Sequence, residues 1–288
     1  MCRFVLYLGP PLVLSTLITE PANSMIHQSF HSHERKEPLN GDGFGVAWYQ
    51  HELSDEPGVF RSITPAWSNR NLLDLARVTR STCVLAHVRA ATPGMAVTET
   101  NTHPFAWGPY AFMHNGEIGG FHQIKRRLLA GLSDEAFDLI GSTTDSEHFF
   151  ALLGDRHRER AAGAAGGGRA VEEIAAALTA AVADVRALTR PLGQVSYLNV
   201  AVTDGRRAVV CRYTDGAPEE APSLYLHTGK RYVCKDSRCR IIEPELDHHA
   251  VLVCSEPLSD DPGWSRVPVN HQVLIHRDRA VDVRPMTA

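Results

Sequence analysis

The sequence predicts an α+β fold in which helices pack on sheets with antiparallel or mixed strand order. Strand-like segments come first, helical segments follow, and strand-like segments return to the end of the chain. This grouping differs from the one-by-one alternation of strands and helices in βαβ folds. No glycine-rich phosphate-binding pattern and no internal repeat argue for another architecture. With 288 residues, the chain is long enough to bury a sizeable core in one large domain.

Apolar stretches followed by turn-forming residues predict buried strands in the first half of the chain. These stretches are residues 4–8, 45–49, 83–89 and 110–115.

Two helices are predicted next, at residues 121–129 and 146–153. The second places Phe149 and Leu153 on one side, and Asp145 lies near its first turn.

The middle of the chain contains a low-complexity segment and a longer helix. Residues 161–168 are only alanine and glycine, so we expect a flexible surface loop there. Apolar residues then recur at three- and four-residue steps from Val171 to Leu188, which predicts an amphipathic helix ended by Pro191. Further strands are predicted at residues 197–202, 208–213, 224–227, 250–254 and 272–275.

The charge and hydropathy patterns exclude several classes of protein. The formal net charge is -4 and like charges form no block, so nucleic acid is not an expected partner. No run of 18 apolar residues predicts a membrane-spanning helix. Residues 4–18 resemble a signal peptide, but Gly9 and the Pro10-Pro11 pair interrupt the apolar stretch that a signal needs.

Six cysteines in a chain of this length do not predict a disulfide scaffold, and a reducing cytoplasm is the expected compartment. Cys234 and Cys239, with His248, His249 and Cys254 downstream, suggest a zinc site at first sight. The C-x4-C gap departs from the usual C-x2-C, and no paired histidine spacing follows. Free thiols on strands are therefore predicted, with no metal and no cofactor.

Cys2 is a candidate nucleophile. A small residue after Met1 is typical of sites where the initiator methionine is removed, and removal would leave a thiol and a free α-amino group on one residue. An ordinary α-amino group has a pKa of about 7.7 to 8.0 and a thiol about 8.5, so each can exchange protons with the other near neutral pH. A Met-Cys start also occurs by chance, so this signal needs support from the rest of the chain.

Acyl transfer to a cysteine also requires hydrogen-bond donors for the developing oxyanion. The segment His114-Asn115-Gly116-Glu117 follows an apolar strand, and the Asn115 amide with the Gly116 N–H could supply two donors. The alternative is an Asn-Gly hairpin turn, which is the more common use of this dipeptide.

Two charged residues are candidates for substrate recognition. Arg89 ends an apolar strand and is followed by small residues, which leaves room for a bidentate contact with a carboxylate. A surface ion pair is the alternative for Arg89. Asp145 is predicted to be the N-cap of the following helix or a counter-charge for a substrate ammonium, and the two roles can coexist.

Six motifs, in this order and spacing, resemble the class II glutamine amidotransferases. They are Met1-Cys2-Arg3, residues 40–48 (NGDGFGVAW), 86–92 (AHVRAAT), 101–105 (NTHPF), 114–116 (HNG) and 144–147 (TDSE). The sequence is most similar to the stand-alone branch that includes the glutathione-degrading amidotransferase subunit and the γ-glutamyl hydrolase of ergothioneine biosynthesis. The strong motifs cover residues 2–150, and Ser255-Glu256-Pro257-Leu258, with Trp264 after it, extends a weaker likeness to the C-terminus.

The resemblance implies a four-layer αββα sandwich, the fold of N-terminal-nucleophile hydrolases. It implies one amidotransferase domain over residues 2–288, in which residues 151–288 complete the sandwich and Cys2 lies at the end of the first strand.

The resemblance also assigns the reacting groups. Cys2 would be the nucleophile and, through its α-amino group, the base. Asn115 and Gly116 would form the oxyanion hole. The loop at residues 40–45 would shape the site beneath the nucleophile.

The remaining motif residues would recognise the glutamyl group. Arg89 would bind its α-carboxylate and Asp145 its α-amino group, while Thr92 and His103 would line the pocket. A γ-glutamyl group held at its charged end would place its amide carbonyl against Cys2.

Three functions remain open from the sequence. The first is hydrolysis of a small thiol- or amine-containing γ-glutamyl compound through a glutamyl thioester on Cys2. The second is a glutaminase subunit that delivers ammonia to a separate synthase; either enzyme could also need a partner subunit such as a peptidase. The third is a catalytically silent γ-glutamyl-binding or assembly subunit. Residues 40–43 and 101–104 favour the glutathione-degrading type.

We predict that the mature protein begins at Cys2, because the proposed base is the α-amino group of that residue. The intact mass of active protein measures this directly. Active protein that retains Met1, or that begins near residue 25 as signal cleavage would require, would contradict the mechanism.

Overall fold

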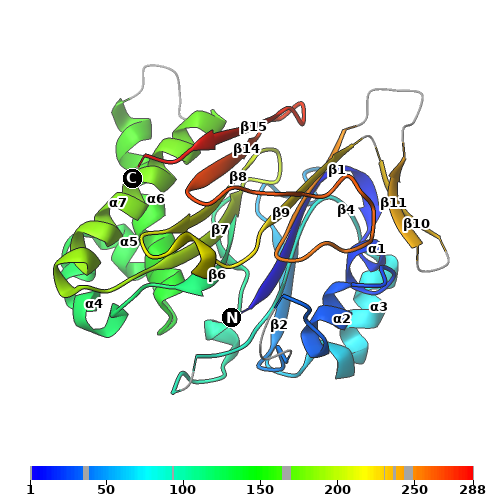
Figure 1. Cartoon of the computed structure of the whole chain (residues 1–288), viewed down its shortest axis with the longest axis horizontal. Coiled ribbons are helices and arrows are strands. Elements are labelled where there is room, and N and C mark those ends of the chain that lie inside the picture. Colours follow the sequence, from blue (N-terminus) through cyan, green and yellow to red (C-terminus); the bar gives the residue numbers. More distant parts are fainter. Residues whose placement is uncertain are drawn as a thin grey trace.

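Helices cover the outer faces of two stacked antiparallel sheets, so the chain forms four layers, αββα (Figure 1). The computed structural model describes residues 2–34, 39–92, 94–163, 170–229, 231–235, 238–242 and 249–287. The predicted α+β class and the four-layer sandwich are confirmed.

The first sheet has seven strands in the order β13-β9-β12-β1-β4-β2-β3. β1 lies near its middle and pairs antiparallel with β4 and β12. The strands are β1 (Arg3–Val13), β2 (Phe44–Trp48), β3 (Gly58–Ser62), β4 (Arg80–Val88), β9 (Tyr225–Gly229), β12 (Ala250–Cys254) and β13 (Ser265–Arg266).

The second sheet has six strands in the order β15-β14-β8-β7-β6-β5, all antiparallel. They are β5 (Phe105–Trp107), β6 (Tyr110–Glu117), β7 (Tyr197–Thr203), β8 (Ala208–Thr214), β14 (His271–Ile275) and β15 (Val281–Pro285).

Alternation along the strands creates the layers, because successive side chains point to opposite faces of a sheet. In β1, Phe4, Leu6 and Leu8 join the core between the two sheets. Val5 and Tyr7 instead join the core beneath the helices on the outer face. Both faces of β1 are therefore buried.

Each sheet has its own set of helices. α1 (Ser15–Ile18), α2 (Met25–Phe30) and α3 (Arg70–Val78) share a core with the first sheet. α4 (Phe121–Ala130), α6 (Asp145–Gly163) and α7 (Val171–Thr189) share a core with the second, and α5 (Asp134–Asp138) packs on α6.

The predicted strands and helices are all present, some with different ends. β1 continues through Pro10 and Pro11 with a shift of register after Leu8. The loop predicted at residues 161–168 is wrong at its start, because α6 extends to Gly163. Alanine is the strongest helix former, so the alanines there continue the helix. The remainder of that predicted loop lies outside the described residues.

β10 (Arg231–Lys235) and β11 (Arg238–Ile242) form a separate two-stranded sheet that stands beside the sandwich in Figure 1. Cys234 and Cys239 lie on these strands, as predicted, at paired positions. Their side chains, and all of His248, lie outside the described part of the chain. Within the described part, no group of three or more His, Cys, Asp or Glu residues suits a metal ion. No described helix is long and apolar enough to cross a membrane.

Candidate active site

A cavity of about 520 Å³ opens where the start of β1 meets the ends of β4 and β6. Six of the seven predicted site residues line it: Cys2, Arg89, Thr92, His103, Gly116 and Asp145. They come from segments that are distant in the sequence, and strand pairing brings them together. In the register of β1 and β4, Arg3 lies opposite Val88, so Cys2 and Arg89 are neighbours.

Cys2 is partly exposed, and its Sγ accepts a hydrogen bond from the Ala90 N–H at 3.4 Å. The other cysteines whose side chains are described are fully buried. Burial raises the pKa of Cys83 and of Cys211 to about 12, and that of Cys254 well above its usual range. A thiolate is the reactive form of cysteine, so these three thiols are unreactive at neutral pH. Among the described cysteines, Cys2 is the one with an accessible thiol.

Arg89 is buried directly after β4, at 4% exposure. Its backbone N–H donates to the Gly43 carbonyl at 2.8 Å, and its Nη2 donates to the Ala96 carbonyl at 3.2 Å. Nη1 has no hydrogen-bond partner among the described residues. Burial lowers the pKa of Arg89, with an opposing effect of Cys2 and Asp42, but a guanidinium stays charged at neutral pH. The cavity therefore contains a fixed positive charge with an unused donor.

Asp145 supplies the opposite charge from the first turn of α6. Its Oδ2 accepts a hydrogen bond at 2.8 Å from the backbone N–H of Ile118, the residue that follows β6. The interpretation of Asp145 as the N-cap is wrong, because the Thr144 hydroxyl occupies that position and accepts from the Glu147 N–H at 3.2 Å. The Asp145 carboxylate, which also accepts from the Ser146 hydroxyl at 3.2 Å, lines the cavity.

Asn115 and Gly116 lie inside β6, opposite Asn199 and Leu198 of β7, so the hairpin-turn alternative is wrong. Gly116 lines the cavity, and a Cβ there would overlap the carbonyl oxygen of Tyr197, so no larger residue fits. The Asn115 side chain, next to Gly116 in the sequence, is fully buried and donates from Nδ2 to the Ser255 Oγ at 3.3 Å. Asn115 is the one predicted site residue that does not line the cavity.

Thr92 and His103 lie on the side of the cavity that holds Arg89. Thr92 is exposed, whereas His103 is buried with no hydrogen-bond partner for either ring nitrogen in the described part of the chain. Its ring centroid lies 4.4 Å from that of His87. Burial and the neighbouring histidines lower the pKa of His103 well below 6.5, so it presents a neutral polar wall.

Further lining residues were not singled out as site residues from the sequence. The Asp42 carboxylate accepts from the Ala91 N–H at 2.8 Å and so ties the loop at residues 40–43 to the segment after β4. Asp42 lies within a recognised motif, which could have indicated it. Tyr197, whose hydroxyl donates to Glu220 at 2.6 Å, has no such signal, because only the pairing of β6 with β7 brings it to the cavity.

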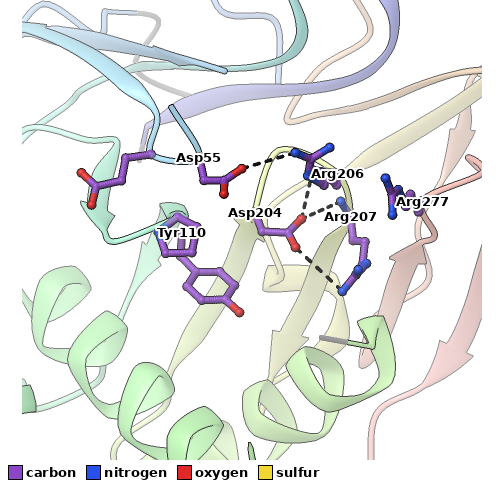
Figure 2. A pocket seen from close by; sticks show the side chains of 8 residues that line it. Asp55, Tyr110, Asp204, Arg206, Arg207 and Arg277 are labelled. Carbon is purple, nitrogen blue, oxygen red and sulfur yellow. Dashed lines mark hydrogen bonds and ion pairs between the residues drawn. The ribbon is translucent and has the colours of Figure 1, made fainter. Parts of the chain in front are cut away.

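A second hollow, of about 550 Å³, lies at the opposite end of β6, where Tyr110 begins the strand (Figure 2). Its side chains are mostly paired with each other: Arg206 with Asp55 at 3.3 Å, and Arg207 with Asp204 at 3.9 Å. It contains no cysteine. The two hollows are similar in volume, so their chemistry decides between them, and only the first has a nucleophile.

The fold and the cavity together define an N-terminal-nucleophile type of sandwich, with Cys2 placed at the start of the first strand. Comparison with known families identifies the group within that class. The chain belongs to the class II glutamine amidotransferases, whose family model matches residues 15–286.

Individual relatives agree with this assignment. The chain is 40% identical over 297 residues to the "Probable glutamine amidotransferase DUG3" of Saccharomyces cerevisiae, and the alignment covers 96% of this chain and 82% of that protein. It is 30% identical to the γ-glutamyl-hercynylcysteine sulfoxide hydrolase of Mycolicibacterium smegmatis, over 99% of this chain and all of that protein. Among solved structures, a glutamine aminotransferase class-II domain protein from Silicibacter pomeroyi superimposes over the full length of both chains, with a TM-score of 0.67 and 25% identity. The predicted family is confirmed.

Beneath the cavity, His87 predicts a pH dependence of stability. Burial lowers the pKa of His87 to about 3, although its hydrogen bond to the His114 carbonyl opposes this. The unfolded chain, with a histidine pKa near 6.5, then binds more protons than the folded chain. Stability is complete above pH 6.5 and falls toward pH 3, by about 1.4 kcal/mol per pH unit for this group.

Urea unfolding between pH 8 and pH 5 measures this slope. His87→Gln keeps an N–H donor but does not titrate, so the slope should become shallower. His122→Gln, at an exposed position on α4, is the matched control and should keep the wild-type slope. A wild-type slope in His87→Gln would exclude His87 as its source.

Proposed function

We propose that this protein hydrolyses the amide bond of a small γ-glutamyl compound, with Cys2 as nucleophile. The observation that carries the proposal is the content of one cavity: a partly exposed thiol, a buried guanidinium with an unused donor, and a carboxylate. A γ-glutamyl group has matching features, since it carries an α-carboxylate and an α-ammonium at one end and the scissile amide at the other.

In this proposal the charged end of the substrate is bound first. Arg89 Nη1 donates to the α-carboxylate, and Asp145 accepts from the α-ammonium. Thr92 and His103 line the same pocket and contribute polar contacts. Because both charges of the substrate are fixed, its carbonyl carbon is held against the Cys2 thiol, and the reaction becomes effectively intramolecular.

The chemical steps use groups already at the cavity. The α-amino group of Cys2 takes the thiol proton, and sulfur attacks the carbonyl carbon. The Gly116 N–H and the Asn115 amide donate to the oxyanion. An Asn side chain has two N–H donors, so one can bond to Ser255 while the other is available to the oxyanion. The departing amine takes the proton from the Cys2 ammonium, and water then cleaves the thioester to release glutamate.

The names of the relatives support this choice of reaction. One relative is a γ-glutamyl-hercynylcysteine sulfoxide hydrolase, and another is named as a glutamine amidotransferase. The second name favours the alternative function, delivery of ammonia from glutamine to a partner. We infer that hydrolysis of a conjugate is the main activity, that the enzyme works in the reducing cytoplasm, and that a peptidase or synthase subunit is a candidate partner.

Replacement of the reacting groups tests the mechanism. Cys2→Ala should abolish turnover of γ-glutamyl substrates with the fold intact, and Asn115→Ala should lower kcat about 10²- to 10³-fold, the usual loss for one oxyanion donor. Circular dichroism checks the fold. Cys83→Ser and Cys254→Ala are controls expected to retain turnover. Unchanged kcat in Cys2→Ala or Asn115→Ala would refute the assignment.

The role of Arg89 predicts a loss of activity even when its charge is kept. Arg89→Lys retains the positive charge but loses the planar fork, so kcat/KM for γ-glutamyl substrates should fall. Substrate analogues without the α-amino or α-carboxylate group should be poor substrates of the wild type. If these analogues are cleaved as fast as the complete substrates, Arg89 and Asp145 do not recognise the glutamyl end.

The leaving group distinguishes hydrolysis from ammonia delivery. A conjugate with a bulky amine, such as a glutathione-like peptide or a γ-glutamyl thiol-imidazole, should be cleaved with a higher kcat/KM than glutamine. Contacts with a large leaving group add binding energy that can be used in the transition state, and ammonia has no such contacts. The assay is run with the protein alone and with candidate peptidase subunits. A preference for glutamine under both conditions would favour the ammonia-delivering function.

A further inference from the structure

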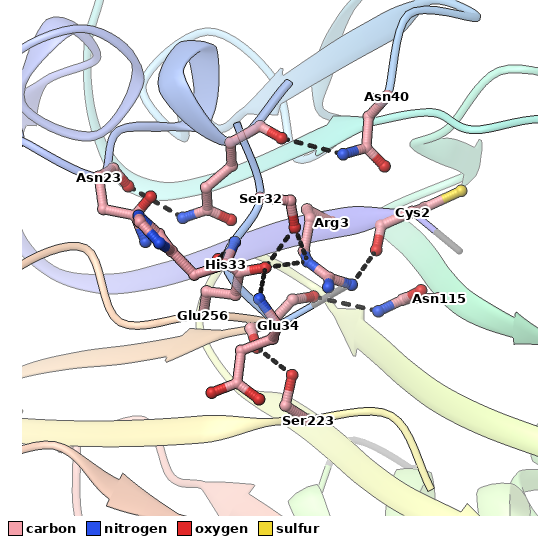
Figure 3. A network of polar contacts seen from close by, with 12 residues as sticks. Cys2, Arg3, Asn23, Ser32, His33, Glu34, Asn40, Asn115, Ser223 and Glu256 are labelled. Carbon is pink, nitrogen blue, oxygen red and sulfur yellow. Dashed lines mark hydrogen bonds and ion pairs between the residues drawn. The ribbon is translucent and has the colours of Figure 1, made fainter. Parts of the chain in front are cut away.

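After β12 the chain bends into a short segment that contains Ser255 and Glu256. Glu256 contacts Arg3, whose guanidinium binds the Cys2 carbonyl (Figure 3). Ser255 contacts the side chain of Asn115. We propose that Ser255 and Glu256 are positioning residues for the γ-glutamyl hydrolysis described above. Glu256 fixes Cys2 through the Arg3 guanidinium, and Ser255 fixes the amide of Asn115. This role depends on the proposed function, which supplies the reaction that the two residues serve.

Arg3 and Glu256 form an ion pair at 2% and 1% side-chain exposure. Arg3 Nε donates to Glu256 Oε1 at 2.5 Å and also lies 2.9 Å from the Ser32 Oγ. On the other side of the same guanidinium, Nη1 donates to the carbonyl oxygen of Cys2 at 2.9 Å. The planar guanidinium of Arg3 therefore connects Cys2 with a carboxylate that lies 253 positions after Arg3 in the sequence.

This geometry restricts Cys2 from its carbonyl side. The backbone of Arg3 is held in β1 opposite Val88, and its side chain turns back to hold the preceding carbonyl. With that carbonyl fixed, rotation about the Cα–C bond of Cys2 is restricted, and so are the directions of its thiol and amino groups. A free arginine side chain would lose this effect, because its many rotamers would release the carbonyl. The contacts of Nε with Glu256 and Ser32 keep the guanidinium in place.

Glu256 is well suited to hold the Arg3 guanidinium because its own carboxylate is hydrogen-bonded from several directions. The backbone N–H groups of His33 and Glu34 donate to it at 2.9 Å and 3.1 Å, and the Ser32 hydroxyl is also in contact. Burial would raise the pKa of Glu256, but the charge of Arg3 and the hydrogen bonds from Ser32 and His33 lower it overall. Glu256 is therefore ionised at neutral pH.

Ser255 is hydrogen-bonded to strands of both sheets. Its N–H donates to the Phe4 carbonyl at 3.0 Å, and its Oγ accepts from the Phe4 N–H at 3.1 Å, so it is bound to β1 of the first sheet. The same Oγ accepts from Asn115 Nδ2, on β6 of the second sheet. Among the described residues it is the one partner of that amide. Ser255 thus sets the distance between the nucleophile strand and the candidate oxyanion donor.

A purely structural role is the competing explanation. Replacing both members of a buried ion pair by apolar residues is often neutral or stabilising, whereas removing one member leaves an uncompensated charge. Stability and activity therefore respond differently to a double substitution, and this difference separates the two roles.

The test compares Glu256→Gln, Ser255→Ala and the double variant Arg3→Met/Glu256→Gln, which removes both charges and keeps an acceptor oxygen for the His33 and Glu34 N–H groups. In Glu256→Gln, kcat for a γ-glutamyl substrate should fall about 10²-fold, a loss typical of a misplaced reacting group, with KM changed by less than about twofold because the glutamyl contacts remain. Ser255→Ala should lower kcat about tenfold through a less fixed oxyanion donor. The double variant should recover the thermal midpoint but not kcat, because Cys2 still lacks its donor.

Asp155→Asn is a closely matched control. Asp155 is buried, and like Glu256 it binds a backbone N–H, a serine hydroxyl and an arginine, here Ser133 and Arg158, on the far side of the second sheet. It should lower the thermal midpoint and leave kcat within about twofold of the wild type. If Glu256→Gln does not fold, Arg3→Lys replaces it, because a single ammonium cannot reach both Glu256 and the Cys2 carbonyl.

The outcomes separate this inference from the proposed function. A wild type that cleaves no γ-glutamyl compound overturns the function. An active wild type, with Glu256→Gln equal to Asp155→Asn in kcat, overturns the positioning role alone. Recovery of kcat together with the thermal midpoint in the double variant also overturns it, because the ion pair would then be only structural. If Ser255→Ala has the wild-type kcat, the proposed positioning of the Asn115 amide by Ser255 is wrong.

Discussion

The site depends on β1, the strand that begins immediately after Cys2. This strand pairs with β4 on one edge and β12 on the other, and apolar side chains fill the layers on both of its faces. A strand that is paired on both edges and packed on both faces cannot shift its register by one residue without moving its side chains to the wrong layer. Because Cys2 directly precedes β1, the fixed register of the strand also limits where Cys2 can lie. The buried Arg3 limits the position of Cys2 further. The position of Cys2 is therefore fixed by the core, although the residue lies at the edge of the core.

The other groups of the cavity are positioned in the same way, at the ends of strands that the core fixes. Arg89 follows β4, and Gly116 lies at the end of β6. Short-range bonds then hold the connecting loops. Asn101, for example, donates to the Ala96 carbonyl at 3.0 Å and to the Thr143 hydroxyl at 3.1 Å, which joins the loop after Arg89 to the turn before Asp145. Arg89 and Asp145 thus keep their separation because their loops are tied together.

Local patterns in the sequence could predict the α+β class, whereas the four-layer sandwich and most of the cavity residues followed from the resemblance of six motifs to a known family. Buried strands appear as short apolar runs, and the motif residues lie at the ends of those runs. The short helices α1 to α3 were not predicted. The sequence does contain a signal for α3, because Leu72, Leu75 and Ala76 recur at three- and four-residue steps and Asn69 precedes them as the N-cap. The Thr144 cap was also missed, because two adjacent residues, Thr144 and Asp145, could each have served as the N-cap, and only the contact of Asp145 with Ile118 distinguishes them.

Contacts between distant segments could not be predicted from local patterns. Nothing near Glu256 indicates that its partner is Arg3, and nothing near Tyr197 indicates that it reaches the cavity. Both facts follow from the order of strands within the sheets, which depends on long-range packing. The Ser255-Glu256-Pro257-Leu258 motif was recognisable, but the function of its first two residues could be inferred only when β12 was placed beside β1.

Several buried polar atoms near the cavity lack a partner in the described part of the chain, among them Arg89 Nη1, Asn115 Oδ1 and both ring nitrogens of His103. A buried polar group that stays without a partner costs about 1–3 kcal/mol relative to a satisfied one. A ligand that supplies the missing partners recovers part of this free energy and stabilises the folded state by mass action. Arg89 lacks an acceptor and Asp145 can accept more than it does, so the ligand that recovers most has a negative and a positive group side by side. An amino-acid head group, with its α-carboxylate and α-ammonium, has this pair of charges, which is why the proposed function assigns Arg89 and Asp145 to its recognition.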